Sequence, residues 1–115
     1  MAEIIDIQFA LEQANGSEEL AKELFTMLIN DLPVLLEKLN QAFTNQDNEA
    51  LRDQAHKIYG STAYCGVPQL RNASNALENS IKLQLPDIEN NINNVKVAIE
   101  QLIGQSEAIL NKSWL

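Results

Sequence analysis

The stretch "LRDQAHKIYGSTAYC", Leu51–Cys65, decides how this chain folds, because its apolar and small side chains recur at the spacing of an α-helix. The successive intervals are four, three, four and three residues, so these side chains form one stripe along a helix. A helix with such a stripe is stable only when it buries that side against other helices. The stripe consists of Leu51, Ala55, Ile58, Thr62 and Cys65.

The only histidine of the chain, His56, lies outside this stripe. At about 100° per residue, its side chain projects roughly 140° from the middle of the stripe, so we expect it to face solvent. Arg52 lies one turn before it on the same side, Gly60 one turn after it and Ala63 two turns after it. Tyr59 falls between that side and the core, a position that suits an aromatic ring with a polar tip.

Gly60 is unusual, because a glycine inside a helix costs about 1 kcal/mol relative to alanine. Four residues after His56, it removes the side chain that would crowd the imidazole, and Ala63 continues this clearance. Imidazole is largely neutral at pH 7, which is its nucleophilic form. Arg52 and Lys57 could balance the charge of a phosphoryl group on the ring. The pattern indicates an exposed nitrogen nucleophile, but an idle histidine beside a glycine that serves close helix packing stays an open alternative.

The rest of the chain is predicted to form helices joined by short turns. Asp6 and Ser17 have the character of N-cap residues, and Asn15-Gly16 ends the first helix. Pro33 is expected to kink or briefly break the second helix, and Pro68 suits the first turn of the fourth. The expected helices span about 6–15, 17–45, 47–64, 67–84 and 87–112.

These elements predict one all-α domain over residues 1–115. Because the connections are short, neighbouring helices should be antiparallel, which gives an up-down four-helix bundle. The short first helix should cap one end of it. No segment alternates as a strand, and no internal repeat or low-complexity tract is present.

Composition excludes several classes of function. Acidic residues outnumber basic ones 16 to 8, giving a net charge of −8, which disfavours binding to nucleic acid or to an anionic membrane. One cysteine cannot form an internal disulfide, so a reduced, cytoplasmic setting is expected. We find no Gly-rich phosphate loop, too few ligands for zinc, no signal peptide and no apolar run near the ~20 residues of a membrane span. We expect Cys65 to be an inert packing residue and Trp114 a packing anchor or an end residue.

The segment "AHKIYGSTAYCGVPQL", Ala55–Leu70, resembles the signature of histidine-containing phosphotransfer (HPt) domains. That signature has a histidine, an apolar residue two positions later, a glycine four positions later, small residues, and a second glycine ten positions later. These are His56, Ile58, Gly60 and Gly66 here. The "YCGVP" continuation is similar to that of the HPt domain at the end of BarA-type hybrid sensor kinases.

The resemblance implies a phosphorelay intermediate of a bacterial two-component system. His56 would accept a phosphoryl group from a receiver-domain aspartate, on Nε2, and pass it to a response-regulator aspartate. The chain would be a phosphotransfer module without its own ATP site or cofactor, and Mg²⁺ would come with the partner receiver. Its partners would be receiver domains of a hybrid kinase and of a response regulator. We further expect a monomer without direct membrane contact, stand-alone or as the cytoplasmic tail of an inner-membrane sensor kinase.

The residues expected around the phosphoryl group and the docked receiver are Arg52, Lys57, Tyr59, Gly60, Ala63 and Glu78. Most members of the resembled family have a lysine three residues after the histidine, where this chain has Tyr59. Lys57 and Arg52 are therefore rival candidates for the stabilising charge, and Glu78 is expected to approach from the neighbouring helix. The alternative function is a non-catalytic acidic adaptor or scaffold, a degenerate HPt domain with an idle histidine.

Overall fold

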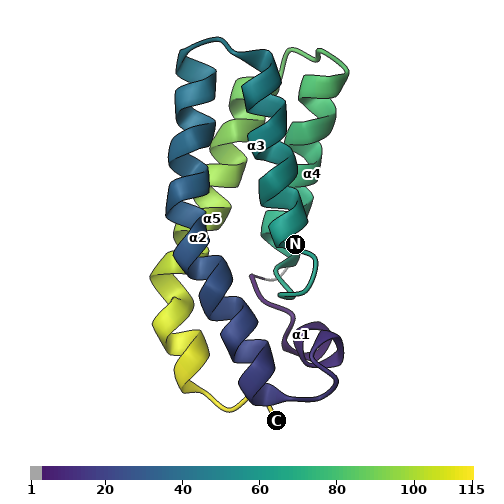
Figure 1. Cartoon of the computed structure of the whole chain (residues 1–115), viewed down its shortest axis with the longest axis vertical. Helices are drawn as coiled ribbons and strands as arrows, with labels where there is room; N and C mark the ends of the chain where they lie inside the picture. Colours follow the sequence, from purple (N-terminus) through teal and green to yellow (C-terminus); the bar gives the residue numbers. More distant parts are fainter. Residues whose placement is uncertain (1–3) are drawn as a thin grey trace.

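The computed structural model describes residues 4–115, and in that part of the chain it contains five helices and no strand. Four long helices run up and down beside one another, while the short first helix lies across one end (Figure 1). The predicted all-α bundle is thus confirmed. The helices are α1 (Ile7–Gln13), α2 (Glu18–Thr44), α3 (Asn48–Ser61), α4 (Pro68–Lys82) and α5 (Ile88–Asn111).

The helix starts follow the expected capping chemistry. The Asp6 carboxylate accepts a hydrogen bond from the Phe9 N–H at 3.0 Å, and the Ser17 hydroxyl accepts one from the Leu20 N–H at 3.1 Å. Each bond satisfies one of the amide groups that a helix leaves unpaired at its start. Asp47 caps α3 in the same way, with its carboxylate accepting from the Ala50 N–H at 3.0 Å.

One helix boundary differs from the prediction, and of the two outcomes expected at Pro33 the kink is the one observed. α3 ends at Ser61, three residues earlier than expected, with Thr62 as its C-cap. α2 runs without a break through Pro33, although its ribbon changes direction near its middle (Figure 1). Pro33 is exposed, so water can reach the carbonyl group that a proline leaves without a partner, and the helix bends instead of breaking.

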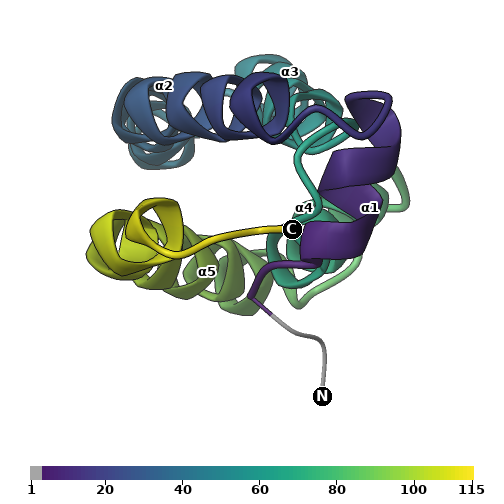
Figure 2. The same ribbon diagram turned by 90° about the horizontal axis from the view of Figure 1, so that it is seen from below.

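The four long helices differ in length, and this shapes the lower end of the molecule. α2 and α5 have 27 and 24 residues, whereas α3 and α4 have 14 and 15. Seen from below, α1 lies across the ends of α3 and α4, and the C-terminal segment runs from α5 toward the middle of that end (Figure 2). α1 and the C-terminal segment therefore both cover the lower end of the bundle.

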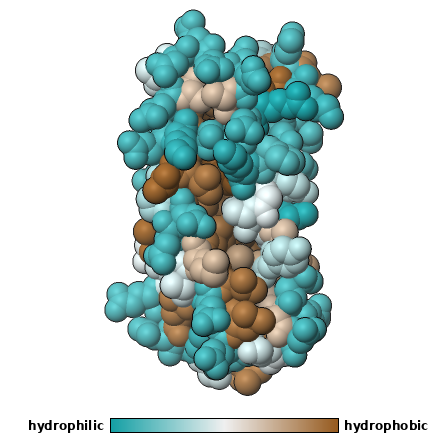
Figure 3. Space-filling view, viewed as in Figure 1, coloured by the Kyte–Doolittle hydropathy of each residue, from teal (hydrophilic) through white to brown (hydrophobic). Residues whose placement is uncertain are grey.

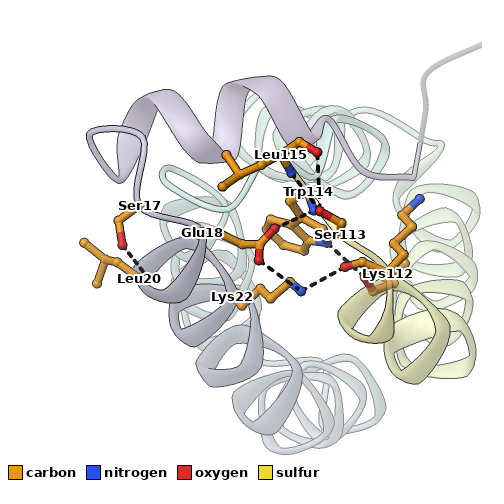
Figure 4. Close-up of polar contacts among 9 residues, drawn as sticks. Ser17, Glu18, Leu20, Lys22, Lys112, Ser113, Trp114 and Leu115 are labelled. Carbon is orange, nitrogen blue, oxygen red and sulfur yellow. Dashed lines mark hydrogen bonds and ion pairs between the residues drawn. The ribbon is translucent and has the colours of Figure 1, made fainter.

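Trp114 closes the gap between the lower parts of α2 and α5 (Figure 4). Its ring is 5% exposed and meets Phe25 edge to face, with 6.0 Å between the ring centroids. Its indole N–H donates to the Ile109 carbonyl at 2.9 Å, and its backbone N–H donates to the Glu18 carboxylate at 2.6 Å. Both polar groups are satisfied, so the ring is a packing anchor, as expected.

Gly66 joins α1 to the turn between α3 and α4. Its carbonyl accepts a hydrogen bond from the Asp6 N–H at 2.6 Å, and its φ is +66°, a backbone conformation that favours glycine. A Cβ at this position would collide with the Asp6 carbonyl oxygen and would lie 3.2 Å from the Ala10 nitrogen. Only glycine allows α1 to pack this closely under the bundle.

We predict that Gly66→Ala lowers the free energy of unfolding by about 3 kcal/mol, from backbone strain together with the collision. Gly16→Ala is the matched control, because Gly16 also has a positive φ of +81°, but a Cβ added there would meet no atom within 4 Å. It should cost about 1 kcal/mol, from strain alone. Urea unfolding followed by circular dichroism measures both, and equal losses would contradict the close approach of α1.

Candidate functional site

α3 exposes His56 because it buries its opposite side. All five residues of the stripe are buried, as the spacing predicted, and α3 packs between α2 and α4. The side chain of His56 is 69% exposed. His56 thus lies within a regular helix, so its backbone groups take part in the hydrogen bonds of α3. Only its side chain, which faces solvent, is available for chemistry.

Glu78 approaches this ring from α4. Its Oε1 lies 2.9 Å from Nδ1 of His56, and its side chain is only 20% exposed. An ionised carboxylate can only accept a hydrogen bond, so Nδ1 carries the proton and donates. In the neutral ring, Nε2 is then the nitrogen with a free lone pair. Glu78 therefore sets both the orientation and the tautomer of His56.

The space beside the ring is open at Gly60. A Cβ added to this glycine would meet no atom within 4 Å apart from its own helix. The alternative in which Gly60 serves close helix packing is therefore wrong, because no other helix of the described chain approaches it. Ala63, one turn further, is half-buried. The outer side of α3 therefore carries no large side chain at Gly60 or Ala63. A partner protein can approach the imidazole over these two residues.

The two candidate cations lie differently. The Lys57 ammonium is 3.4 Å from the Asp53 carboxylate one turn earlier, so its charge is already paired. Arg52 lines a surface hollow of about 670 Å³ together with His56 and Glu78, and among residues 4–115 no carboxylate lies within 4.0 Å of it. Arg52 thus lines the hollow beside His56, whereas Lys57 does not line it and is paired with Asp53. The remaining lining residues are Asp47, Glu49, Ala50 and Asp53.

Tyr59 has a partner that sequence reasoning missed. The Arg71 guanidinium on α4 lies over the Tyr59 ring, with 4.5 Å between Cζ and the ring centroid. Its Nη2 donates to the Tyr59 hydroxyl at 3.0 Å, and its Nη1 donates to the Thr62 hydroxyl at 3.2 Å. Arg71 and Glu78 are seven residues apart, hence two turns, on one side of α4. That spacing is the signal that could have indicated Arg71.

Cys65 does not belong to the reactive surface. Its side chain is buried against α2, with Sγ 3.5 Å from the Leu24 carbonyl oxygen, and burial raises the pKa of the Cys65 thiol to about 11. At neutral pH the thiol stays protonated and is a poor nucleophile. Cys65 is thus a packing residue, as expected.

Within residues 4–115, no helix is long and apolar enough to cross a membrane.

We predict that Gly60→Ala raises the free energy of unfolding by about 1 kcal/mol, because the added Cβ favours the helix and meets nothing. Gly104→Ala in α5 is the matched control, since a Cβ there is also free of contacts, and it should give a similar gain. Thermal unfolding followed by circular dichroism measures both. A loss of stability at Gly60 alone would show that the space beside His56 is occupied.

The comparisons with known proteins agree with this geometry. The family model of the Hpt domain matches residues 23–109. Over 106 residues the chain is 34% identical to "Sensor protein GacS" of Pseudomonas syringae pv. syringae, which covers 92% of this chain and 12% of that protein. Over 78 residues it is 35% identical to "Signal transduction histidine-protein kinase BarA" of Escherichia coli strain K12, covering 68% of this chain and 8% of BarA.

The fold has a solved counterpart. The crystal structure of the HPT domain from a sensor hybrid histidine kinase of Shewanella superposes with a TM-score of 0.83 at 28% identity, and the match covers 93% of each chain. This chain spans about an eighth or less of the length of the curated relatives above. Because the family model extends over most of the chain, including His56 and Glu78, the chain belongs to the Hpt domain family.

Proposed function

We propose that this chain is a phosphorelay intermediate of a bacterial two-component system. Nε2 of His56 accepts a phosphoryl group from a receiver-domain aspartate and passes it to the aspartate of a response regulator. The observation that carries the proposal is the exposed imidazole whose Nδ1 is held by Glu78, in a chain of the Hpt family. The similar proteins named sensor protein and histidine-protein kinase support the signalling context.

The transfer needs no general base in this chain. The free lone pair of Nε2 attacks the phosphorus of the aspartyl phosphate in line, the N–P bond forms, and the P–O bond to the aspartate breaks. The aspartate leaves as a carboxylate. The proton stays on Nδ1, so the ring gains a positive charge, and the Glu78 carboxylate 2.9 Å away stabilises that charge. Reversal of the same steps on a second receiver completes the relay.

The phosphoryl group itself also needs positive charge. Arg52 is the candidate within this chain, because it lines the hollow beside His56 without a carboxylate partner among the described residues. Its planar guanidinium can hold two phosphoryl oxygens at once. We expect the Mg²⁺ ion and the lysine of the reaction to be supplied by the receiver.

The receiver would dock over α2 and α3. Leu20, Met27 and Val34 recur every seven residues along one side of α2 and are exposed, and Tyr64 is exposed just beyond α3. Most of the α2 residues that line a groove with α5 point about 100° away from this row, so the row lies on the flank of α2 that faces away from α5. On this face apolar surface gathers in the middle and lower parts, over α2 and below α3 (Figure 3). A receiver seated there reaches His56 past Gly60.

The wider setting follows from the relatives. We propose that ATP is used by a kinase domain outside residues 1–115 and that the domain acts in the cytoplasm, on its own or as part of a hybrid kinase. We also propose that it works as a monomer, since the docking face must be free for receivers, and that it does not bind nucleic acid, given its net charge of −8.

We predict that the wild-type chain, incubated with a phosphorylated receiver and Mg²⁺, acquires label that is stable in alkali and labile in acid, as a phosphoramidate is. His56→Gln should acquire none and keep its helical circular dichroism, because the side chain is mostly exposed. Labelling of His56→Gln, or none of the wild type with any receiver of the same organism, would favour the adaptor alternative.

Replacing Glu78 separates its hydrogen bond from its charge. Glu78→Ala removes both and should slow transfer about tenfold, the effect of losing a hydrogen bond to a charged group. Glu78→Gln keeps an oxygen that can accept from Nδ1 but removes the charge, so its rate should fall between those of Glu78→Ala and the wild type. Rapid-quench kinetics at saturating receiver measures the rates. Equal rates for all three proteins would contradict the role of Glu78.

A further inference from the structure

Arg71 is a cation whose guanidinium, within the described part of the chain, contacts an aromatic ring and two hydroxyl groups. It is half-buried at the start of α4, and among residues 4–115 no carboxylate oxygen lies within 4.0 Å of it. Its contacts are instead the ring and hydroxyl of Tyr59 and the hydroxyl of Thr62. Two of these contacts are with Tyr59, and the third, to Thr62, fixes the guanidinium itself, so together they define the position of the Tyr59 ring more tightly than a single hydrogen bond would.

The position of that ring matters for His56. Tyr59 lies three residues after His56, and residues at this spacing are neighbours on a helix surface. A long side chain on a helix leans toward the N-terminus and covers the preceding turn. For Tyr59 that turn is the one that carries His56. A Tyr59 ring that is not held against α4 would therefore cover the imidazole of His56.

We propose that Arg71 is a positioning residue for phosphotransfer, which holds Tyr59 against α4 and so keeps the ring off the imidazole of His56. This inference rests on the proposed function of His56. It assigns Arg71 no contact with the phosphoryl group. Its effect passes through Tyr59, so it must disappear when the Tyr59 ring is absent.

A purely structural role for Arg71 is the competing explanation. The same contacts tie the end of α3 to the start of α4 and would stabilise the bundle without affecting catalysis. Such a role changes the fraction of folded protein but leaves the transfer rate of each folded molecule unchanged. A double-mutant cycle between Arg71 and Tyr59, with rates normalised to the folded fraction, separates the two roles.

The experiment measures phosphoryl transfer from a labelled receiver to the full chain, at saturating receiver and below saturation. Arg71→Gln should lower the maximal rate about tenfold, within the range of coupling between residues in contact, with little change in the receiver concentration at half-maximal rate. Arg71→Lys keeps the charge but cannot stack on the ring and bond both hydroxyls at once, so it should be nearly as slow. Arg71→Gln combined with Tyr59→Ala should be as fast as Tyr59→Ala alone.

Each contrary outcome is decisive. A wild-type rate in Arg71→Lys would show that charge alone suffices, and a double variant slower than Tyr59→Ala would show that Arg71 acts without Tyr59. Unchanged normalised rates in Arg71→Gln would leave only the structural role. Any of these results overturns the inference while wild-type labelling upholds the proposed function. A wild-type chain that accepts no phosphoryl group fails the proposed function itself.

Discussion

The structure depends on the burial of one side of α3. Once Leu51, Ala55 and Ile58 face the core, the helix cannot rotate, and His56 must point outward. The same packing fixes how far α3 is shifted along its axis relative to α4, which we call its height. At that height the Glu78 carboxylate meets Nδ1 at 2.9 Å and the Arg71 guanidinium meets the Tyr59 ring. A histidine on a loop would lack such fixed partners, and each lost constraint would add conformational freedom to the attacking nitrogen.

The acidity of the chain gives the cations near His56 special weight. A phosphoryl group on His56 adds negative charge beside Glu78 and Asp53, so the product state depends on positive charge nearby. Lys57 is paired with Asp53, whereas Arg52 lines the hollow beside the ring. The positive charge that develops on the imidazole is matched by Glu78. Arg52 is the one cation among the residues that line this hollow, which also holds the carboxylates of Asp47, Glu49 and Asp53.

Much of this could be predicted from sequence, because it depends on spacing within single helices. The stripe of α3, the exposure of His56 and the caps Asp6 and Ser17 all follow from local rules. Contacts between helices depend on their relative height, which no periodicity specifies. Glu78 was therefore expected only as an approach from the next helix, and the contact of Arg71 with Tyr59 was missed. The local rule for Pro33 allowed a kink or a break, and it could not decide between them because the packing of both halves of α2 against the core keeps the helix continuous.

The most direct test of the central claim is the tautomer of His56, measured by two-bond ¹⁵N–¹H correlation NMR on the wild-type chain at a pH where the ring is neutral. The account predicts that Nδ1 carries the proton and that Nε2 shows the chemical shift of an unprotonated ring nitrogen. After phosphorylation, coupling to phosphorus should appear at Nε2. A ring protonated on Nε2, or phosphorus bonded to Nδ1, would contradict the role of Glu78 and the proposed direction of attack.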